Sequence, residues 1–421
     1  MRLRTLLALL AVVASAAFGL AACGGDGDDS TANPAESGTT TGMADDMDMG
    51  AVAVTSPAAD LRVTLDTLLG EHALLAIAAS QKGLDGDKDF EAAAAALDAN
   101  SMEVADAIGS VYGDEAAKQF LDGPSLWRDH IGFFVDYTVG LAGNDKAAQQ
   151  EAVDNLTGYT GAFSGFLAEA TGLPQPALQD DLAMHIGHLK GQIDAYAKKD
   201  FARAYDLTRE AYAHMYETGD TLSGAIQEQS PDTFPLEPAT AAASDLRVTL
   251  DRLLGEHAIL AMLATQKGLN GDADFEAIAA ALDANSVDIA EAIGSVYGNE
   301  AAKQFLDGPS LWRDHIGFFV DYTVALAKGD EAGQQEAVDN LTGYTGAFSG
   351  FLAEATGLPQ PALQEGVTMH VMQLKGALDA YAAGDYEEAY RLFREAYKHM
   401  VATGDTLATG IVQQSPDMFA R

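Results

Sequence analysis

The feature that most constrains the fold is a long internal duplication. The hexapeptide Leu61–Asp66 recurs unchanged as Leu246–Asp251, and the tetrapeptide Trp127–His130 recurs as Trp312–His315. Both pairs are separated by 185 positions, and no insertion or deletion changes this offset up to the end of the chain. Each copy is long enough to be a complete domain, so the pattern predicts a tandem domain duplication and not a short-period solenoid.

The N-terminal residues resemble a bacterial export signal. Two arginines within the first four residues precede an apolar stretch over residues 6–18, and Leu20–Cys23 reads Leu-Ala-Ala-Cys, which resembles a lipobox. This resemblance implies that a signal peptide of residues 1–22 is cleaved and that the thiol of Cys23 is lipidated. We therefore expect a lipoprotein held at the outer face of the cell membrane by its lipid, with plain secretion as the alternative.

Cys23 is also the only cysteine of the chain, and this limits the chemistry of the folded part. No disulfide, thiolate nucleophile or cysteine-rich metal site can form there. The net charge of −39 repels phosphate backbones, which argues against nucleic acid as a partner. No later apolar run is long enough to span a bilayer, so contact with the membrane is expected through the lipid alone. The acidity otherwise indicates a well-solvated surface, or one that attracts cations.

Residues 23–56 are rich in small and acidic residues and poor in large apolar ones, which predicts a disordered acidic linker. The linker contains Met43, Met47 and Met49. Thioether sulfur is a soft ligand that suits Cu(I), so these three methionines form a candidate copper-binding tail. The alternative is an acidic tail whose methionines bind no metal.

Each copy has the apolar spacing of amphipathic helices throughout, and no pair of strands is expected. In the first copy the pattern predicts six helices, over about residues 61–83, 90–111, 124–141, 146–170, 175–196 and 201–222. Short connections favour antiparallel neighbours. The sequence therefore predicts an all-α protein of two tandem antiparallel helical bundles, residues 57–229 and 244–421, joined by a Pro-rich linker over residues 230–243.

Eight of the nine histidines recur at the same position in both copies. They are the pairs His72/His257, His130/His315, His185/His370 and His214/His399. In each copy they fall on the apolar stripes of four different helices. Counting residues from the helix ends, at about 1.5 Å per residue, puts the four imidazoles at one depth of the bundle.

Four buried imidazoles at one depth need polar partners away from water. A transition-metal ion satisfies them together, and neutral imidazole suits copper, iron and zinc; haem held between two histidines is a variant. Glu210 and Glu395 stand one turn before His214 and His399. They are therefore candidate metal ligands, or candidate acceptors of a hydrogen bond from the second ring nitrogen of a metal-bound histidine. Glu71 precedes a histidine directly and projects about 100° away from it, towards a flank or solvent. The alternative to a metal is a buried polar layer in which the histidines bond to nearby polar side chains.

Five motifs carry a resemblance to a known group of proteins. They are Glu71-His72, Trp127–Ile131, Phe133–Thr138, Thr171–Pro174 and Ala211–Met215. With both repeats they make the body similar to exported bacterial helical-bundle proteins of unsettled function, sometimes labelled copper amine oxidase-like. Amine oxidases of that type are β-rich and use an Asn-Tyr cofactor motif, which this chain lacks. The architecture also resembles ferritin-like and hemerythrin-like bundles, without their metal-binding motifs.

The familiar catalytic motifs are missing from the sequence. There is no Gly-x-Ser-x-Gly elbow, Walker loop, dinucleotide fingerprint or His-Glu-x-x-His zinc motif. We therefore expect a non-catalytic protein that binds a transition metal or haem and stores, buffers or hands it on. A structural or interaction module with a buried histidine layer is the alternative, and an oxidase or peroxidase at the same site is a third. The sequence identifies no particular protein partner.

Overall fold

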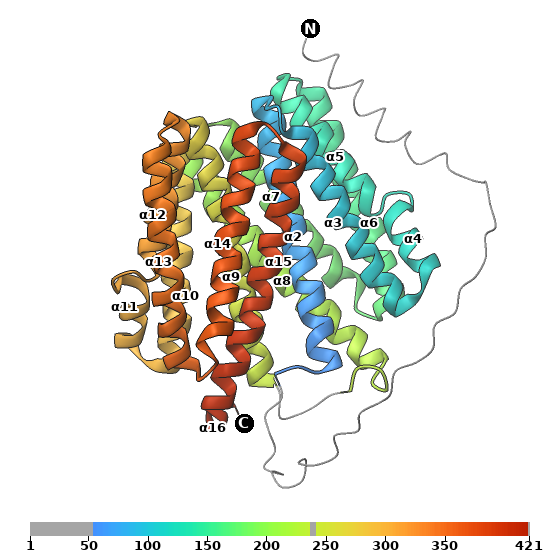
Figure 1. The fold of residues 1–421 in the computed structure, drawn as a ribbon. Coiled ribbons are helices and arrows are strands. Elements are labelled where there is room, and N and C mark those ends of the chain that lie inside the picture. Colours follow the sequence, from blue (N-terminus) through green and yellow to red (C-terminus); the bar gives the residue numbers. More distant parts are fainter. Residues whose placement is uncertain (1–53, 236–240, 420–421) are drawn as a thin grey trace, which may run out of the picture. The chain divides into compact units, whose positions relative to one another are not determined.

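The computed structural model describes residues 54–235 and 241–419 (Figure 1). Throughout these residues the chain is helical and has no strand, which confirms the all-α prediction. Cys23, the three methionines Met43, Met47 and Met49, and the middle of the Pro-rich linker lie outside the described residues. The lipid anchor and the copper tail therefore stay predictions.

The described helices follow the same order in both copies. In the first repeat they are α2 (Pro57–Asp85), α3 (Phe90–Tyr112), α4 (Asp114–Asp122), α5 (Trp127–Ala142), α6 (Lys146–Thr171), α7 (Gln175–Ala197) and α8 (Phe201–Gln229). In the second repeat they are α9 (Ala241–Asn270), α10 (Phe275–Tyr297), α11 (Asn299–Asp307), α12 (Trp312–Lys328), α13 (Glu331–Thr356), α14 (Gln360–Ala383) and α15 (Tyr386–Gln414), followed by the short α16 (Pro416–Phe419).

The short helices α4 and α11 are the difference from the six helices expected in each copy. Gly113 ends α3 with φ of 89°, a conformation that favours glycine, and the acidic residues Asp114 and Glu115 open α4 at its positive end. The following helix then begins at Trp127 and not at Pro124, because the backbone amide of Ser125 donates to the Asp129 carboxylate at 2.6 Å.

The ends of the long helices follow from local capping. The Ser56 hydroxyl accepts from the amide of Ala59 at 3.1 Å, and Pro57 occupies the first turn of α2, where its missing N–H is harmless. Gly86 ends the same helix in the left-handed conformation, with φ of 67°. These caps fix how far α2 extends on either side of His72.

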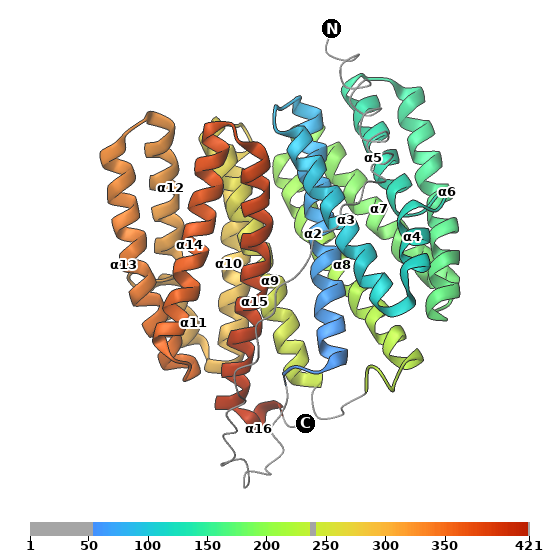
Figure 2. The same ribbon diagram turned by 45° about the vertical axis from the view of Figure 1, so that its right-hand side comes forward.

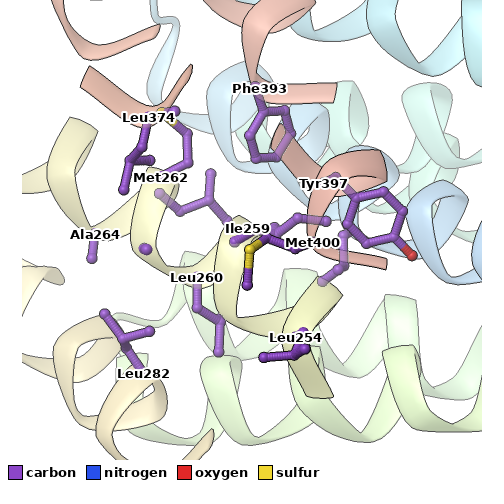
Figure 3. Close-up of a cluster of buried hydrophobic side chains, with 14 of the residues drawn as sticks. Leu254, Ile259, Leu260, Met262, Ala264, Leu282, Leu374, Phe393, Tyr397 and Met400 are labelled. Atoms are coloured by element: carbon purple, nitrogen blue, oxygen red, sulfur yellow. The ribbon is translucent and has the colours of Figure 1, made fainter. Parts of the chain in front are cut away.

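Within each repeat one long helix lies at the centre of the packing. In the first repeat α2 packs against α3, α5, α7 and α8, and in the second α9 packs against α10, α12, α14 and α15 (Figures 1 and 2). Figure 3 shows part of the core around α9, in which Ile259 and Leu260 of that helix and Phe393 and Met400 of α15 belong to one cluster of buried side chains. The central helices therefore carry one histidine each, His72 and His257, into the middle of their repeat.

The two repeats also contact each other, through α2, α3 and α8 of the first and α9, α10 and α15 of the second. Arg394 pairs with Glu71 at 2.9 Å, and Arg209 pairs with Glu256 at 2.8 Å. The two pairs occupy equivalent positions of the duplicated sequence, so the contact has approximate two-fold symmetry. Glu71, which the sequence placed on a flank or in solvent, is only 1% exposed and lies between the repeats.

The expectation that no later apolar run is long enough to span a bilayer was wrong for α2, which could cross a membrane by length and composition. In the folded unit, however, 72% of its apolar window is buried among the other helices. Its apolar character is accounted for by its central place in the first repeat.

Candidate metal centre

Three histidines of the first repeat meet in the core. His72 comes from α2, His130 from α5 and His185 from α7, and all three are buried. One ring nitrogen from each lies within 4.8 Å of the others, and the Nε2 atoms of His72 and His130 are 3.3 Å apart. We call these residues the first triad.

The second repeat holds the same arrangement, the second triad. His257 of α9, His315 of α12 and His370 of α14 are buried, with one nitrogen from each within 4.8 Å of the others. The Nε2 atoms of His257 and His315 are 3.4 Å apart. The duplication therefore preserves the geometry as well as the residue types.

Aromatic side chains hold the imidazoles in place. The Trp127 ring lies 4.5 Å from that of His72, and the Tyr159 ring stacks on that of His130 at 4.7 Å. Trp312 and Tyr344 make the same contacts at the same distances in the second triad. Packing of this kind restricts the rings to one orientation, as a preformed site requires.

The surroundings keep the imidazoles neutral. Burial lowers the pKa of His130 from 6.5 to about 4, and the pKa values of His72 and His185 fall well below the ordinary value because of burial and repulsion from the neighbouring histidines. In the second triad burial lowers the pKa of His315 to about 4 and that of His370 to about 3. Neutral imidazole, with one free lone pair, is the form that binds metals.

The distances in each triad suit a small metal ion. Two nitrogens bound tetrahedrally to one zinc ion at about 2.0–2.1 Å lie about 3.3–3.4 Å apart, which matches the His72–His130 separation of 3.3 Å. The buried Nδ1 atoms of His72, His185 and His257 have no hydrogen-bond partner. Three nitrogen ligands leave a fourth coordination position for another group.

The fourth repeated histidine lies outside each triad. The Nε2 atom of His214 is 3.2 Å from the backbone oxygen of Asp181, and that of His399 is 2.9 Å from the backbone oxygen of Gly366. The first contact joins α8 to α7, and the second joins α15 to α14. The geometry supports three histidines per repeat, not four.

The two glutamates considered as ligands or acceptors lie on the surface. Glu210 pairs with Arg203 and Glu395 pairs with Arg391, and both glutamates are nearly half exposed. Neither contacts a triad histidine in the described structure. Trp127 and Trp312 were missed as neighbours of the triads, although they stand in the same repeated tetrapeptide as His130 and His315.

Comparison of the chain with protein-family models, curated proteins and solved structures gives no match. The functional argument therefore rests on the two triads and their surroundings.

Proposed function

We propose that the protein binds transition-metal ions, one in each repeat, through three neutral histidines. The observation that carries this proposal is the occurrence of the same buried triad twice, with the Nε2 atoms of two histidines at 3.3 Å and 3.4 Å. Buried polar groups normally have partners, and a metal ion supplies one to all three imidazoles at once.

The ligand set narrows the choice of metal. Each triad offers only imidazole nitrogen, which suits copper, zinc and iron better than the hard cations magnesium and calcium. Haem between two of the histidines is disfavoured, because two metal–nitrogen bonds in line need about 4 Å between the nitrogens, and His72 and His130 are closer than that.

We further propose that the protein acts outside the cytoplasm as a store or carrier of the metal. The N-terminal lipobox supports attachment to the outer face of the membrane, and Met43, Met47 and Met49 would offer soft ligands to Cu(I) between the anchor and the helices. Two equal sites in one chain suit storage or transfer better than a single reaction.

The competing function is a structural module in which the histidines form a polar layer. The 3.3 Å contact between His72 and His130 is also compatible with a hydrogen bond between imidazoles. That alternative leaves both ring nitrogens of the buried His370 without a partner among the described residues, whereas a metal ion would bind one of them.

A cobalt titration separates the two functions. Co²⁺ bound to three nitrogens in a four-coordinate site gives strong visible absorption, whereas Co²⁺ in water does not. We expect this absorption in the wild type, half of it in His130→Gln, and all of it in the matched control His214→Gln. A spectrum that stays that of aqueous Co²⁺ would exclude metal binding and leave the structural module.

A further inference from the structure

The second repeat contains an apolar cavity beside its triad. The cavity has a volume of about 600 Å³ and is lined by side chains from every helix between α9 and α15. Its walls include Leu254, Ile293, Phe348 and Leu363, and His370 of the second triad is among the residues that line it. Protein interiors are otherwise packed with few voids larger than a water molecule, so a space of this size calls for an occupant.

The lining of the cavity extends far enough along two helices for a chain-like molecule. On α14 its lining extends from His370 to Pro359, and on α15 from His399 to Ile411. These spans of 11 and 12 residues correspond to about 16–18 Å along the helices. Apolar cavities of only about 150 Å³ stay free of water and take up benzene, and drug-sized ligands occupy about 300–1,000 Å³.

The lining of the cavity reaches the surface between α14 and α15, and we place its opening there. It is lined by the small residues Gly366 and Ala402, and Ala402 is exposed. The first repeat has Asp181 and Glu217 at the equivalent positions. In the first repeat the Asp181 carboxylate accepts a hydrogen bond from the Thr218 hydroxyl at 3.0 Å and lies 3.6 Å from the Nε2 atom of His214. The Asp181 side chain therefore occupies the space between α7 and α8 that corresponds to the opening. The opening is therefore a property of the second repeat's own residues.

The charges around the cavity decide which head group a bound apolar molecule can carry. Among the residues that the structure describes, no lysine or arginine lines the cavity, whereas the exposed Glu354 does. The whole chain carries a net charge of −39. An anionic head group would find no counter-ion and would be repelled, whereas an uncharged one meets Thr403 and Thr406 at the opening.

We propose that this cavity binds one uncharged molecule with a linear hydrocarbon chain, which enters between α14 and α15 near the second triad and extends along these helices towards Pro359 and Ile411. Binding needs only the apolar walls and the opening, so it does not depend on a metal in the triad. The proposal and the metal site can therefore fail separately.

The test uses the full chain with a chelator present and N-phenyl-1-naphthylamine as a fluorescent probe. We expect uptake of the probe by the wild type and its displacement by decan-1-ol, with decanoate at least tenfold weaker. The double variant Gly366→Asp/Ala402→Glu, which restores the side chains of the first repeat, should bind the probe at least tenfold more weakly. Ala402→Phe should do the same without adding charge.

Thr368→Ala is the matched control, because it also introduces the first repeat's residue on α14 but does not line the cavity. It should bind as the wild type does. Absence of probe uptake by the wild type, unchanged uptake by both blocked variants, or equal displacement by decanoate would each overturn the proposal.

Discussion

The buried triads make the stability of the metal-free protein depend on pH in a defined direction. His130 has a pKa of about 4 in the folded state, against 6.5 for an unperturbed histidine. Between these two values the unfolded chain binds a proton that the folded chain does not. The free energy of unfolding therefore falls as the pH falls from about 6.5 to about 4 and does not fall further below that range for this residue.

The size of the effect follows from the pKa difference. A pH of 5.0 lies about 1.5 units below the pKa of a histidine in the unfolded chain. Protonation at that pH therefore stabilises the unfolded state by about 2 kcal/mol for one histidine. His315, with the same folded pKa of about 4, contributes a similar amount. Two such residues thus remove about 4 kcal/mol from a total that is usually about 5–15 kcal/mol.

Urea unfolding followed by circular dichroism, with a chelator present, measures this directly. The variant His130→Gln has no imidazole to protonate, so its stability relative to the wild type should improve by about 2 kcal/mol between pH 7.5 and pH 5.0. His315→Gln should behave alike in the second repeat. If the wild type and His130→Gln lose stability in parallel over this range, His130 is not held neutral in the folded state and the reasoning is wrong.

Three further outcomes are expected. The substitution Glu71→Ala leaves the largely buried Arg394 with Glu103 as its remaining carboxylate partner, and should lower the unfolding free energy by about 1.5–3 kcal/mol. Asp66 is buried, which raises the pKa of its carboxyl to about 10, so Asp66→Asn should become more stable than the wild type as the pH rises from 4 to 8. Zinc at about 100 times its Kd should add about 2.7 kcal/mol to the stability of a repeat that holds it, and His185→Gln should abolish this gain in the first repeat.

Each of these has a clear opposite result. A Glu71→Ala protein as stable as the wild type would show that the Arg394 pair contributes nothing, and Arg209 with Glu256 offers the same test at the equivalent position. If calorimetric scans at several pH values show no gain in the stability of Asp66→Asn over the wild type as the pH rises, the carboxyl of Asp66 is not held protonated in the folded protein. An unchanged melting temperature of the wild type on addition of zinc would argue for the structural module.

The helices could be predicted from the sequence because their apolar stripes are long. The expected helix over residues 146–170 corresponds to Lys146–Thr171, and that over 90–111 to Phe90–Tyr112. The helix Asp114–Asp122 was missed because nine residues are too few for a stripe to be recognised. Gly113, which separates it from the preceding helix, was the available signal.

The triads were only partly predictable. Counting from the helix ends gives the depth of His72, His130 and His185 but not the direction in which each helix turns its side chains. His214 was therefore expected in the centre, whereas it faces the backbone of α7. The burial of Glu71 was beyond prediction, because its partner Arg394 belongs to the other repeat, 323 residues away in the sequence.

The central claim is that each triad holds one metal ion, and the number of bound ions tests it most directly. After dialysis against zinc and removal of free metal, elemental analysis should find two ions per chain in the wild type. The double variant His130→Gln/His315→Gln should retain none, and His214→Gln/His399→Gln should retain both. A wild type without bound metal, or a double triad variant that still binds two ions, would contradict the account.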